Sequence, residues 1–162
     1  MEAASMRRRQ GTGECQMCSY CGCEAETVIS ELMADHAEIA LMVDHVNAAL
    51  ARGNRTAAAA TCGEIAQLFS AHARKEEEGL FAALRSDPLA AEAVRELESE
   101  HRQLELSLEK AARGLSAPAD IFLALATLLD HANREDTDVF PVALQVLPDS
   151  AWERIQATSA SN

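Results

Sequence analysis

The feature that most constrains this chain is a set of ionisable residues at core positions of four amphipathic segments. Apolar residues recur every three or four positions in each segment, which is the spacing of one face of an α-helix. A histidine interrupts the apolar face of every segment. These histidines are His36, His72, His101 and His131. Two segments also carry a glutamate four residues after the histidine, Glu76 and Glu135. Such faces can pack together only if something pairs their polar groups.

The composition and the breaks between the segments predict an all-α fold. Ala, Leu and Glu, which favour helices, are the most frequent residues of the chain. Glycine or proline stands between the segments, at 51–54, 86–88 and 114–118, where helices commonly end and begin. Because short loops join antiparallel helices, we predict an up-down-up-down antiparallel four-helix bundle. Residues with helical spacing that are expected to fill its core include Met33, Met42, Phe69 and Phe81.

We divide the chain into a bundle and two flanking segments. Residues 1–23 are rich in glycine, arginine and cysteine, and are interpreted as a flexible Cys-rich N-terminal segment. Residues 24–148 are expected to form the bundle, and residues 149–162 a C-terminal tail. Pro141 stands in the last turns of the fourth segment, so a kink or a frayed end is expected there.

The charge and hydropathy of the chain argue against two classes of partner. A formal net charge of −12 disfavours binding to nucleic acid, which is itself a polyanion. Apolar runs such as Ile121 to Leu129 are shorter than the roughly 20 residues of a membrane-spanning helix. No apolar stretch follows the three arginines at 7–9, so we expect no secretory signal and a cytoplasmic protein.

The spacing of histidine and glutamate indicates a metal site. Residues four apart on a helix differ by about 40° in rotation, so His72 and Glu76 point the same way, as do His131 and Glu135. Imidazole binds iron, zinc or copper, and a carboxylate can bridge two ions. Alternatively, each histidine is a satisfied core residue and each pair an ordinary surface contact between residues i and i+4. Six such groups together would leave several buried polar atoms without partners, which favours a dinuclear metal site.

Two similar strings surround the histidine–glutamate pairs. They are His72-Ala-Arg-Lys-Glu-Glu-Glu-Gly-Leu-Phe and His131-Ala-Asn-Arg-Glu-Asp-Thr-Asp-Val-Phe-Pro. Over about residues 24–147 the chain resembles the hemerythrin family, in its His-His-Glu cation-binding branch. The resemblance implies that His36 and His72 hold one iron ion, that His101 and His131 hold the other, and that Glu76 and Glu135 bridge them. An oxo, hydroxo or water bridge would complete this di-iron centre.

The third segment departs from the oxygen-carrying members of that family. Those members have a second histidine four residues after the one on the third helix, where this chain has Glu105. Glu105 is either a seventh ligand or a solvated residue. Carriers also use an aspartate five residues after the last histidine, a spacing that Asp136 has, but Glu135 is better placed because five residues rotate by about 140°. Asp35 and Glu100 precede two of the histidines and are expected to be solvated, because adjacent residues diverge on a helix.

The resemblance implies a protein that binds or reacts with O₂, hydrogen peroxide or nitric oxide. A carboxylate ligand at Glu105 would favour the oxidised metal, and with it a peroxide-decomposing or nitric-oxide-reactive oxidoreductase over an oxygen store. The alternatives are a metal- or redox-sensing regulatory module without turnover, and a bundle without metal. The sequence does not define the redox partner or the oligomeric state.

Four cysteines stand close together near the N-terminus, in the pattern C-x2-C-x2-C-x-C. They are Cys15, Cys18, Cys21 and Cys23. Four such thiols could bind zinc or act as a redox group. An unstructured, reactive segment is the alternative, because the usual zinc site separates two cysteine pairs by a longer loop.

Overall fold

The computed structural model describes residues 23–159, and the side chains of residues 27–158. Cys15, Cys18 and Cys21 lie outside the described residues, as does the side chain of Cys23, so zinc or redox chemistry at these cysteines stays a prediction. Among the described helices, none combines the length and the hydropathy that a bilayer span requires.

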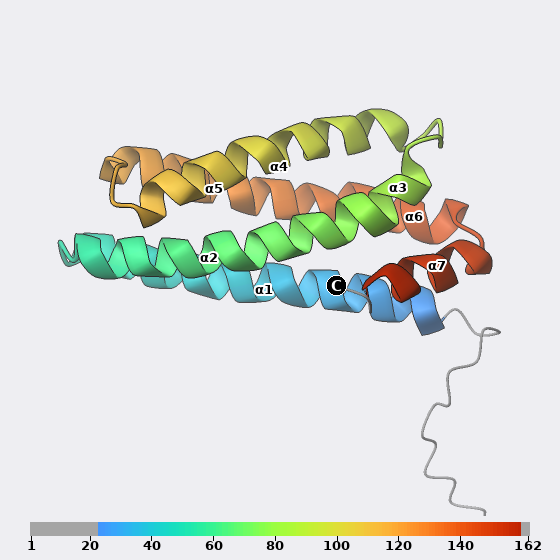
Figure 1. Ribbon diagram of the computed structural model, residues 1–162, viewed down its shortest axis with the longest axis horizontal. Helices are drawn as coiled ribbons and strands as arrows, with labels where there is room; N and C mark the ends of the chain where they lie inside the picture. Colours follow the sequence, from blue (N-terminus) through green and yellow to red (C-terminus); the bar gives the residue numbers. More distant parts are fainter. Residues whose placement is uncertain (1–22, 160–162) are drawn as a thin grey trace, which may run out of the picture.

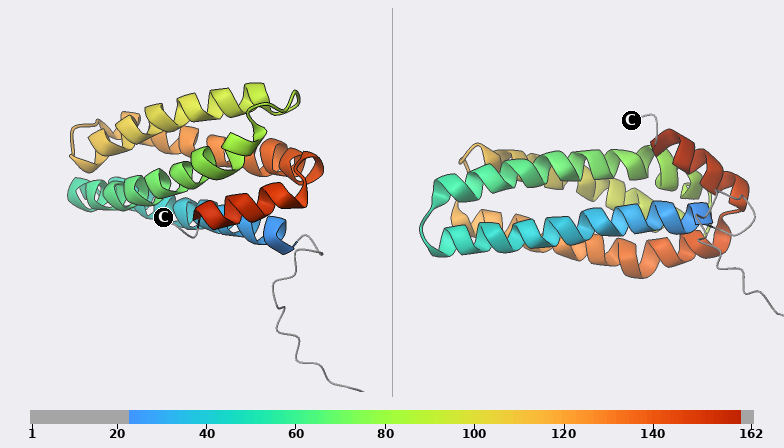
Figure 2. Two further views of the ribbon diagram at one scale, coloured as in Figure 1. Left: turned by 45° about the vertical axis from the view of Figure 1, so that its right-hand side comes forward. Right: turned by 90° about the horizontal axis from the view of Figure 1, so that it is seen from below.

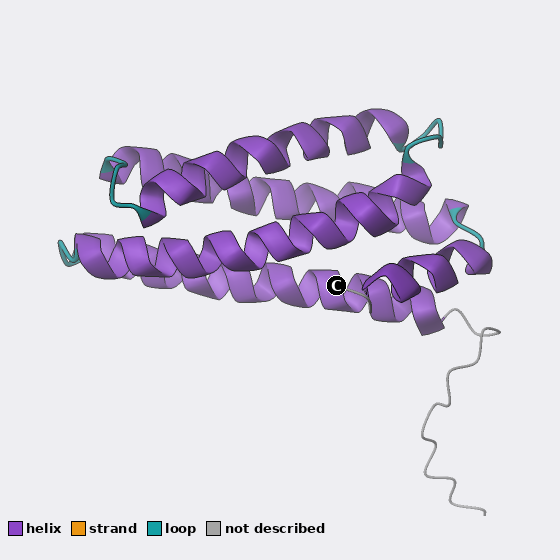
Figure 3. Ribbon diagram, in the orientation of Figure 1, coloured by secondary structure: helices purple, strands orange, loops and turns teal. Residues whose placement is uncertain are grey.

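Four long helical segments lie side by side along most of the length of the molecule (Figure 1, Figure 3). The second and fourth segments each contain a π-helical turn, named η1 and η2. In chain order the elements are α1 (Cys23–Ala51), α2 (Arg55–Lys75), η1 (Glu76–Leu80), α3 (Phe81–Leu84), α4 (Ala91–Ala112), α5 (Pro118–Arg134), η2 (Glu135–Val139), α6 (Phe140–Val146) and α7 (Asp149–Ser159). Short connections join the four segments at alternating ends (Figure 1). The described chain is therefore all-helical, as predicted, and its arrangement is consistent with a hemerythrin-like helical bundle.

The segments end where the sequence predicts breaks. Gly53 and Gly114 have φ values of 71° and 69°, a left-handed conformation that glycine adopts without strain. Asn54 caps α2, because its side-chain oxygen accepts a hydrogen bond from the backbone N–H of Ala57 at 3.0 Å. Pro118 begins α5, where its missing N–H has no cost. The predicted breaks at 51–54 and 114–118 are thus confirmed.

Two apolar clusters fill the bundle, one toward each end. The first joins the N-terminal half of α1 to α3, the start of α4, and α6, and includes Leu32 and Leu97. The second joins the C-terminal half of α1 to α2, the end of α4, and α5, and includes Val46 and Leu108. Along each segment the predicted ligands fall between these two clusters. Met33 does not join them, because it is 46% exposed, so its predicted place in the core is wrong.

The two π-helical turns begin at the predicted glutamate ligands. In each turn the N–H of a phenylalanine bonds the carbonyl oxygen five residues earlier, Phe81 to Glu76 and Phe140 to Glu135. Such turns are rare and occur frequently at functional sites. The helix continues past Pro141 to Val146, so it does not end at this proline. The irregularity expected there lies just before it, in η2.

Residues 149–159, which the sequence suggested were part of a tail, form the helix α7. It packs against α1 and η1 (Figure 2), and its Ala151, Trp152 and Ile155 are buried. Gly79 of η1 permits this approach, because a Cβ atom there would lie 3.1 Å from Cγ2 of Ile155. The sequence signal for α7 is weak because so short a helix places few residues on its apolar face.

We expect Trp152→Ala to lower the free energy of unfolding by about 3–5 kcal/mol, because it removes the largest buried side chain of α7. The control is Leu89→Ala, at a residue that is 76% exposed, and a surface change of this kind should stay within about 0.5 kcal/mol. Urea unfolding followed by circular dichroism gives both values. Equal midpoints for the two variants would show that α7 is not part of the folded core.

Candidate metal centre

The four histidines and two glutamates predicted as ligands meet in the middle of the bundle. The histidines come one each from α1, α2, α4 and α5, and the glutamates are the first residues of η1 and η2. All six side chains are buried, and the most exposed of them, His36, is only 7% exposed. The six side chains are therefore in the interior, where the helical periodicity of the sequence places them, and their use as ligands stays a prediction.

The six residues form two overlapping groups. His36, His72, Glu76 and Glu135 each offer one ligand atom, and these atoms lie within 4.8 Å of one another. The second group consists of Glu76, His101, His131 and Glu135, whose ligand atoms also lie within 4.8 Å of one another. Both glutamates belong to both groups, which is the arrangement that two ions bridged by two carboxylates require.

The imidazole Nε2 atoms point inward, toward the glutamate carboxylates. Glu76 contacts His72 of its own segment and His101 of the other half, whereas Glu135 lies 3.0–3.9 Å from Nε2 of all four histidines. The distances from Nε2 to the nearest carboxylate oxygen are 3.3 Å for His72–Glu76, 3.0 Å for His131–Glu135, 3.4 Å for His101–Glu76 and 3.2 Å for His36–Glu135. The two halves of the chain thus build one continuous centre.

Buried atoms without hydrogen bonds show that these residues fit metal ions. Among the described residues, neither carboxylate oxygen of Glu76 or Glu135 has a hydrogen-bond partner, and the same holds for Nε2 of His101 and His131. Buried polar atoms without hydrogen bonds are costly, and a cation would satisfy the nitrogen and oxygen lone pairs together. Nε2 of His36 and Nε2 of His72 lie 3.0 Å apart. Two nitrogens bound at right angles to one ion, each at about 2.1 Å, have this separation.

A second ring of carboxylates surrounds the centre. Each histidine directs its other ring nitrogen, Nδ1, at a carboxylate oxygen on another helical segment. The pairs are His36–Asp136 at 2.9 Å, His72–Asp35 at 3.4 Å, His101–Glu77 at 2.9 Å and His131–Glu100 at 3.0 Å. A proton on Nδ1 donated to such a carboxylate fixes the ring and leaves the Nε2 lone pair for a metal.

This ring corrects two expectations, those for Asp35 and Glu100, and adds one residue. Asp35 and Glu100 are not solvated bystanders, because each contacts the histidine of a neighbouring helix. Asp136 belongs to neither ligand group and instead holds His36. Glu77 was not among the predicted site residues. Because Glu77 and Asp136 both stand five residues after a histidine, the repeat between the two halves could have identified it.

Aromatic rings enclose the centre, and two of them, Phe81 and Phe140, occupy equivalent positions in the two halves of the chain. Phe140 stacks on His36, with ring centroids 5.9 Å apart and planes 4° apart, and Phe81 stacks on His101 at 5.7 Å and 10°. Phe69 meets His101 and His131 edge-on, at 5.5 and 5.9 Å. All three phenylalanines are at most 1% exposed, so they close off the space around the ligands.

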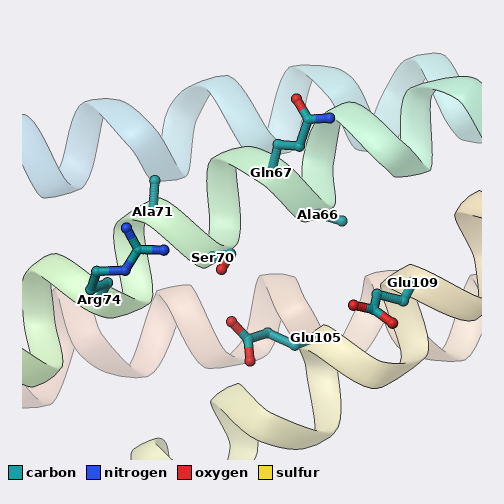
Figure 4. A pocket seen from close by; sticks show the side chains of 7 residues that line it. All are labelled: Ala66, Gln67, Ser70, Ala71, Arg74, Glu105 and Glu109. Atoms are coloured by element: carbon teal, nitrogen blue, oxygen red, sulfur yellow. The ribbon is translucent and has the colours of Figure 1, made fainter.

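Glu105 lies outside both ligand groups. It lines a surface groove of about 510 Å³ between α2 and α4, together with Arg74 and Glu109 (Figure 4). Because α4 is regular, Glu105 stands one turn beyond His101, about 6 Å further along the axis. The structure therefore does not support its use as a seventh ligand.

A family model for the hemerythrin HHE cation binding domain matches residues 27–143. The chain belongs to this hemerythrin family. The matched range includes all six ligand candidates and all four outer carboxylates. No curated protein and no solved structure matches the chain. The cation-binding character of the family agrees with the buried histidine–glutamate groups.

Contacts within this hemerythrin-like centre shift the pKa values of His72, His101 and Glu135. Burial lowers the pKa of His101, but contacts with Glu135 and Glu76 outweigh burial and raise this pKa to about 10. The pKa of His72 is likewise raised well above 6.5, because Glu76 outweighs burial. Burial raises the pKa of Glu135, but contacts with the histidines, His101 first, lower it well below 4.5. A metal ion must therefore displace protons from the imidazoles.

We expect Glu135→Gln to reduce bound metal to half of the wild-type amount or less, because Glu135 belongs to both ligand groups. Glu105→Gln is the matched control, since it makes the same chemical change outside both groups, and it should bind metal at the wild-type level. Elemental mass spectrometry of metal-loaded protein gives the stoichiometry. Loss of metal in the Glu105 variant would restore this residue as a ligand.

We expect the stabilisation by metal to grow as pH rises from 6 to 9. In the metal-free protein the raised pKa of His101 contributes stability that is complete below its ordinary value of 6.5 and is lost as pH approaches about 10. The lowered pKa of Glu135 contributes stability that is present above 4.5 and lost only in acid, so it does not oppose this trend. Melting temperatures of chelator-treated and metal-loaded protein should diverge with pH. If the two melting temperatures changed in parallel with pH, metal binding would not displace protons from the imidazoles.

Proposed function

We propose that this protein is a non-haem di-iron protein that binds or reacts with O₂, hydrogen peroxide or nitric oxide. The observation that carries the proposal is the pair of buried ligand groups that share both glutamates. Imidazole and carboxylate together suit iron, and the chain belongs to a cation-binding hemerythrin family. The alternating connections of the four segments support the up-down-up-down bundle as the architecture that holds this centre (Figure 1).

The proposal gives each residue of the centre a role. His36 and His72 would hold one iron ion, His101 and His131 the other, and Glu76 and Glu135 would bridge them. When bound, the irons would supply an open coordination position and a reversible change between the ferrous and ferric states. The outer carboxylates hold the four imidazoles in orientation through Nδ1.

The enclosure of the centre supports a ligand of only a few atoms. Apolar clusters lie on both sides of the ligands, and phenylalanine rings pack against the histidines. His36 is the most exposed ligand candidate, and it is only 7% exposed. A diatomic molecule or peroxide could reach such a site with little rearrangement, whereas a larger substrate could not.

A metal- or redox-sensing module without turnover is the second candidate. Its support is the set of buried atoms without partners, because metal occupancy would then contribute strongly to the stability of the bundle. The preference for a redox enzyme that rested on Glu105 as a ligand no longer applies, since Glu105 faces the surface groove. Turnover alone separates the two candidates.

Protein produced in iron-supplemented cells should contain two iron ions per chain and show the visible absorption of a bridged ferric pair. Consumption of many equivalents of peroxide would identify an enzyme, and a single stoichiometric oxidation would identify a sensor. Zinc or manganese bound in preference to iron would show that the di-iron assignment is wrong.

His101→Ala should lower the iron content and the melting temperature together, because metal binding and folding are coupled. His45→Ala is the matched control, since His45 is exposed on α1 and stands outside both ligand groups. The control should keep the wild-type iron content. A His101 variant that retains two irons would remove this histidine from the ligand set.

A further inference from the structure

The four outer carboxylates are of two kinds. Oδ2 of Asp35 accepts from Nδ1 of His72 and also from the ammonium group of Lys75, at 3.2 Å. Oε2 of Glu100 likewise accepts from Nδ1 of His131 and from the guanidinium group of Arg134. In both cases one oxygen atom serves both a histidine and a cation.

The other two carboxylates serve histidines alone. Among the described residues, neither Glu77 nor Asp136 forms an ion pair with a lysine or arginine. Their distances to Nδ1 of His101 and His36 are both 2.9 Å, whereas the carboxylates shared with a cation stand 3.0 and 3.4 Å from their histidines. Each ligand group therefore contains one histidine of each kind.

The cations occupy equivalent positions in the two halves of the chain. Lys75 and Arg134 each stand three residues after a histidine and directly before a glutamate of the centre. They are 34% and 33% exposed, so part of each side chain is shielded from solvent. Asp130, 3.7 Å from Arg134, is 76% exposed and is screened by water. The contact between a cation and an outer carboxylate thus occurs once in each half of the chain.

The charges of the centre match a pair of divalent ions. Its two inner and four outer carboxylates carry six negative charges, and Lys75 and Arg134 offset two of them. The four remaining negative charges equal the charge of two divalent ions. Without the two cations, six negative charges would remain, which equals the charge of two trivalent ions.

We propose that Lys75 and Arg134 are positioning residues that favour divalent over trivalent ions in this centre. A carboxylate on Nδ1 makes an imidazole a stronger ligand, which stabilises a more highly charged metal. A cation on the same oxygen weakens this effect at His72 and His131. The inference rests on the proposed di-iron function: a ferric ion gains one electron from a one-electron donor and becomes ferrous, and both cations favour that gain.

The test uses the iron-loaded full chain and its midpoint reduction potential, titrated with mediator dyes as one-electron donors. Lys75→Met and Arg134→Met should each raise the ferric-to-ferrous ratio at a fixed potential by up to about tenfold, which lowers the midpoint by up to ~59 mV. The double variant should shift further. Lys75→Arg should keep the wild-type midpoint, and all shifts should shrink at high salt.

Arg74→Met is the matched control. It removes the same charge from the adjacent residue of α2, but Arg74 lines the surface groove (Figure 4). Among the described residues, the cations paired with outer carboxylates are Lys75 and Arg134. Its midpoint should equal that of the wild type. Equal midpoints in the control and the Lys75→Met variant would overturn the inference, as would loss of both metals on Lys75→Met, which would indicate a purely structural contact.

A second readout makes the inference testable without iron chemistry. Competition between Ga³⁺ and Zn²⁺, which do not change oxidation state, reports the preference for trivalent over divalent ions. The double variant should raise the relative affinity for Ga³⁺, and an unchanged ratio would contradict the inference. A changed ratio in a protein that takes up no iron would support the charge matching and refute the di-iron function. Two irons per chain together with unchanged midpoint potentials would support the di-iron function and refute the charge matching.

Discussion

The structure depends on neutralising two carboxylates at the centre of the bundle. Glu76 and Glu135 are fully buried between two apolar clusters, and their oxygens have no hydrogen-bond partner among the described residues. Protonated imidazoles or metal ions can offset such charges at that depth. The four histidines can do either, because their Nε2 atoms surround the carboxylates. The competition between protons and metal therefore governs both the stability of the bundle and its capacity to bind ions.

The two π-helical turns explain how one short string supplies so many parts of the centre. On a regular helix, residues nine apart face opposite sides, so Phe81 and Phe140 would point away from the histidines that precede them. The additional residue of a π-helical turn returns both phenylalanines to the core, where they stack on histidines of the other half. The same turns place Glu77 and Asp136 against those histidines. One backbone irregularity thus positions a glutamate of the centre, an outer carboxylate and an aromatic wall in each half.

The ligand candidates could be predicted from the sequence because they obey local rules of rotation. His72 and Glu76, four apart on one helix, share a direction whatever surrounds them. The predictions for Asp35 and Glu100 were wrong because helical rotation shows only that each side chain points away from the adjacent histidine on its own helix. It does not show which side chain of another helix each one contacts. Glu105 has the correct rotation but lies one turn too far along α4. The position of α7 also depends on a distant contact, between Ile155 and Gly79.

The internal repeat makes the donors of the two ligand groups alike, so differences between the groups arise from their surroundings. Each group has two histidines, shares both glutamates and has one outer carboxylate paired with a cation. Phe69 breaks the symmetry, because the corresponding position in the second half is Leu128. Its ring meets His101 and His131 edge-on at 5.5 and 5.9 Å and lies farther from His72, at 6.5 Å. The group with His72 also contains His36, the most exposed of the candidates. The two groups offer the same ligand atoms but are packed differently. The difference in packing favours entry of a small ligand on the side of His36, where less protein must move.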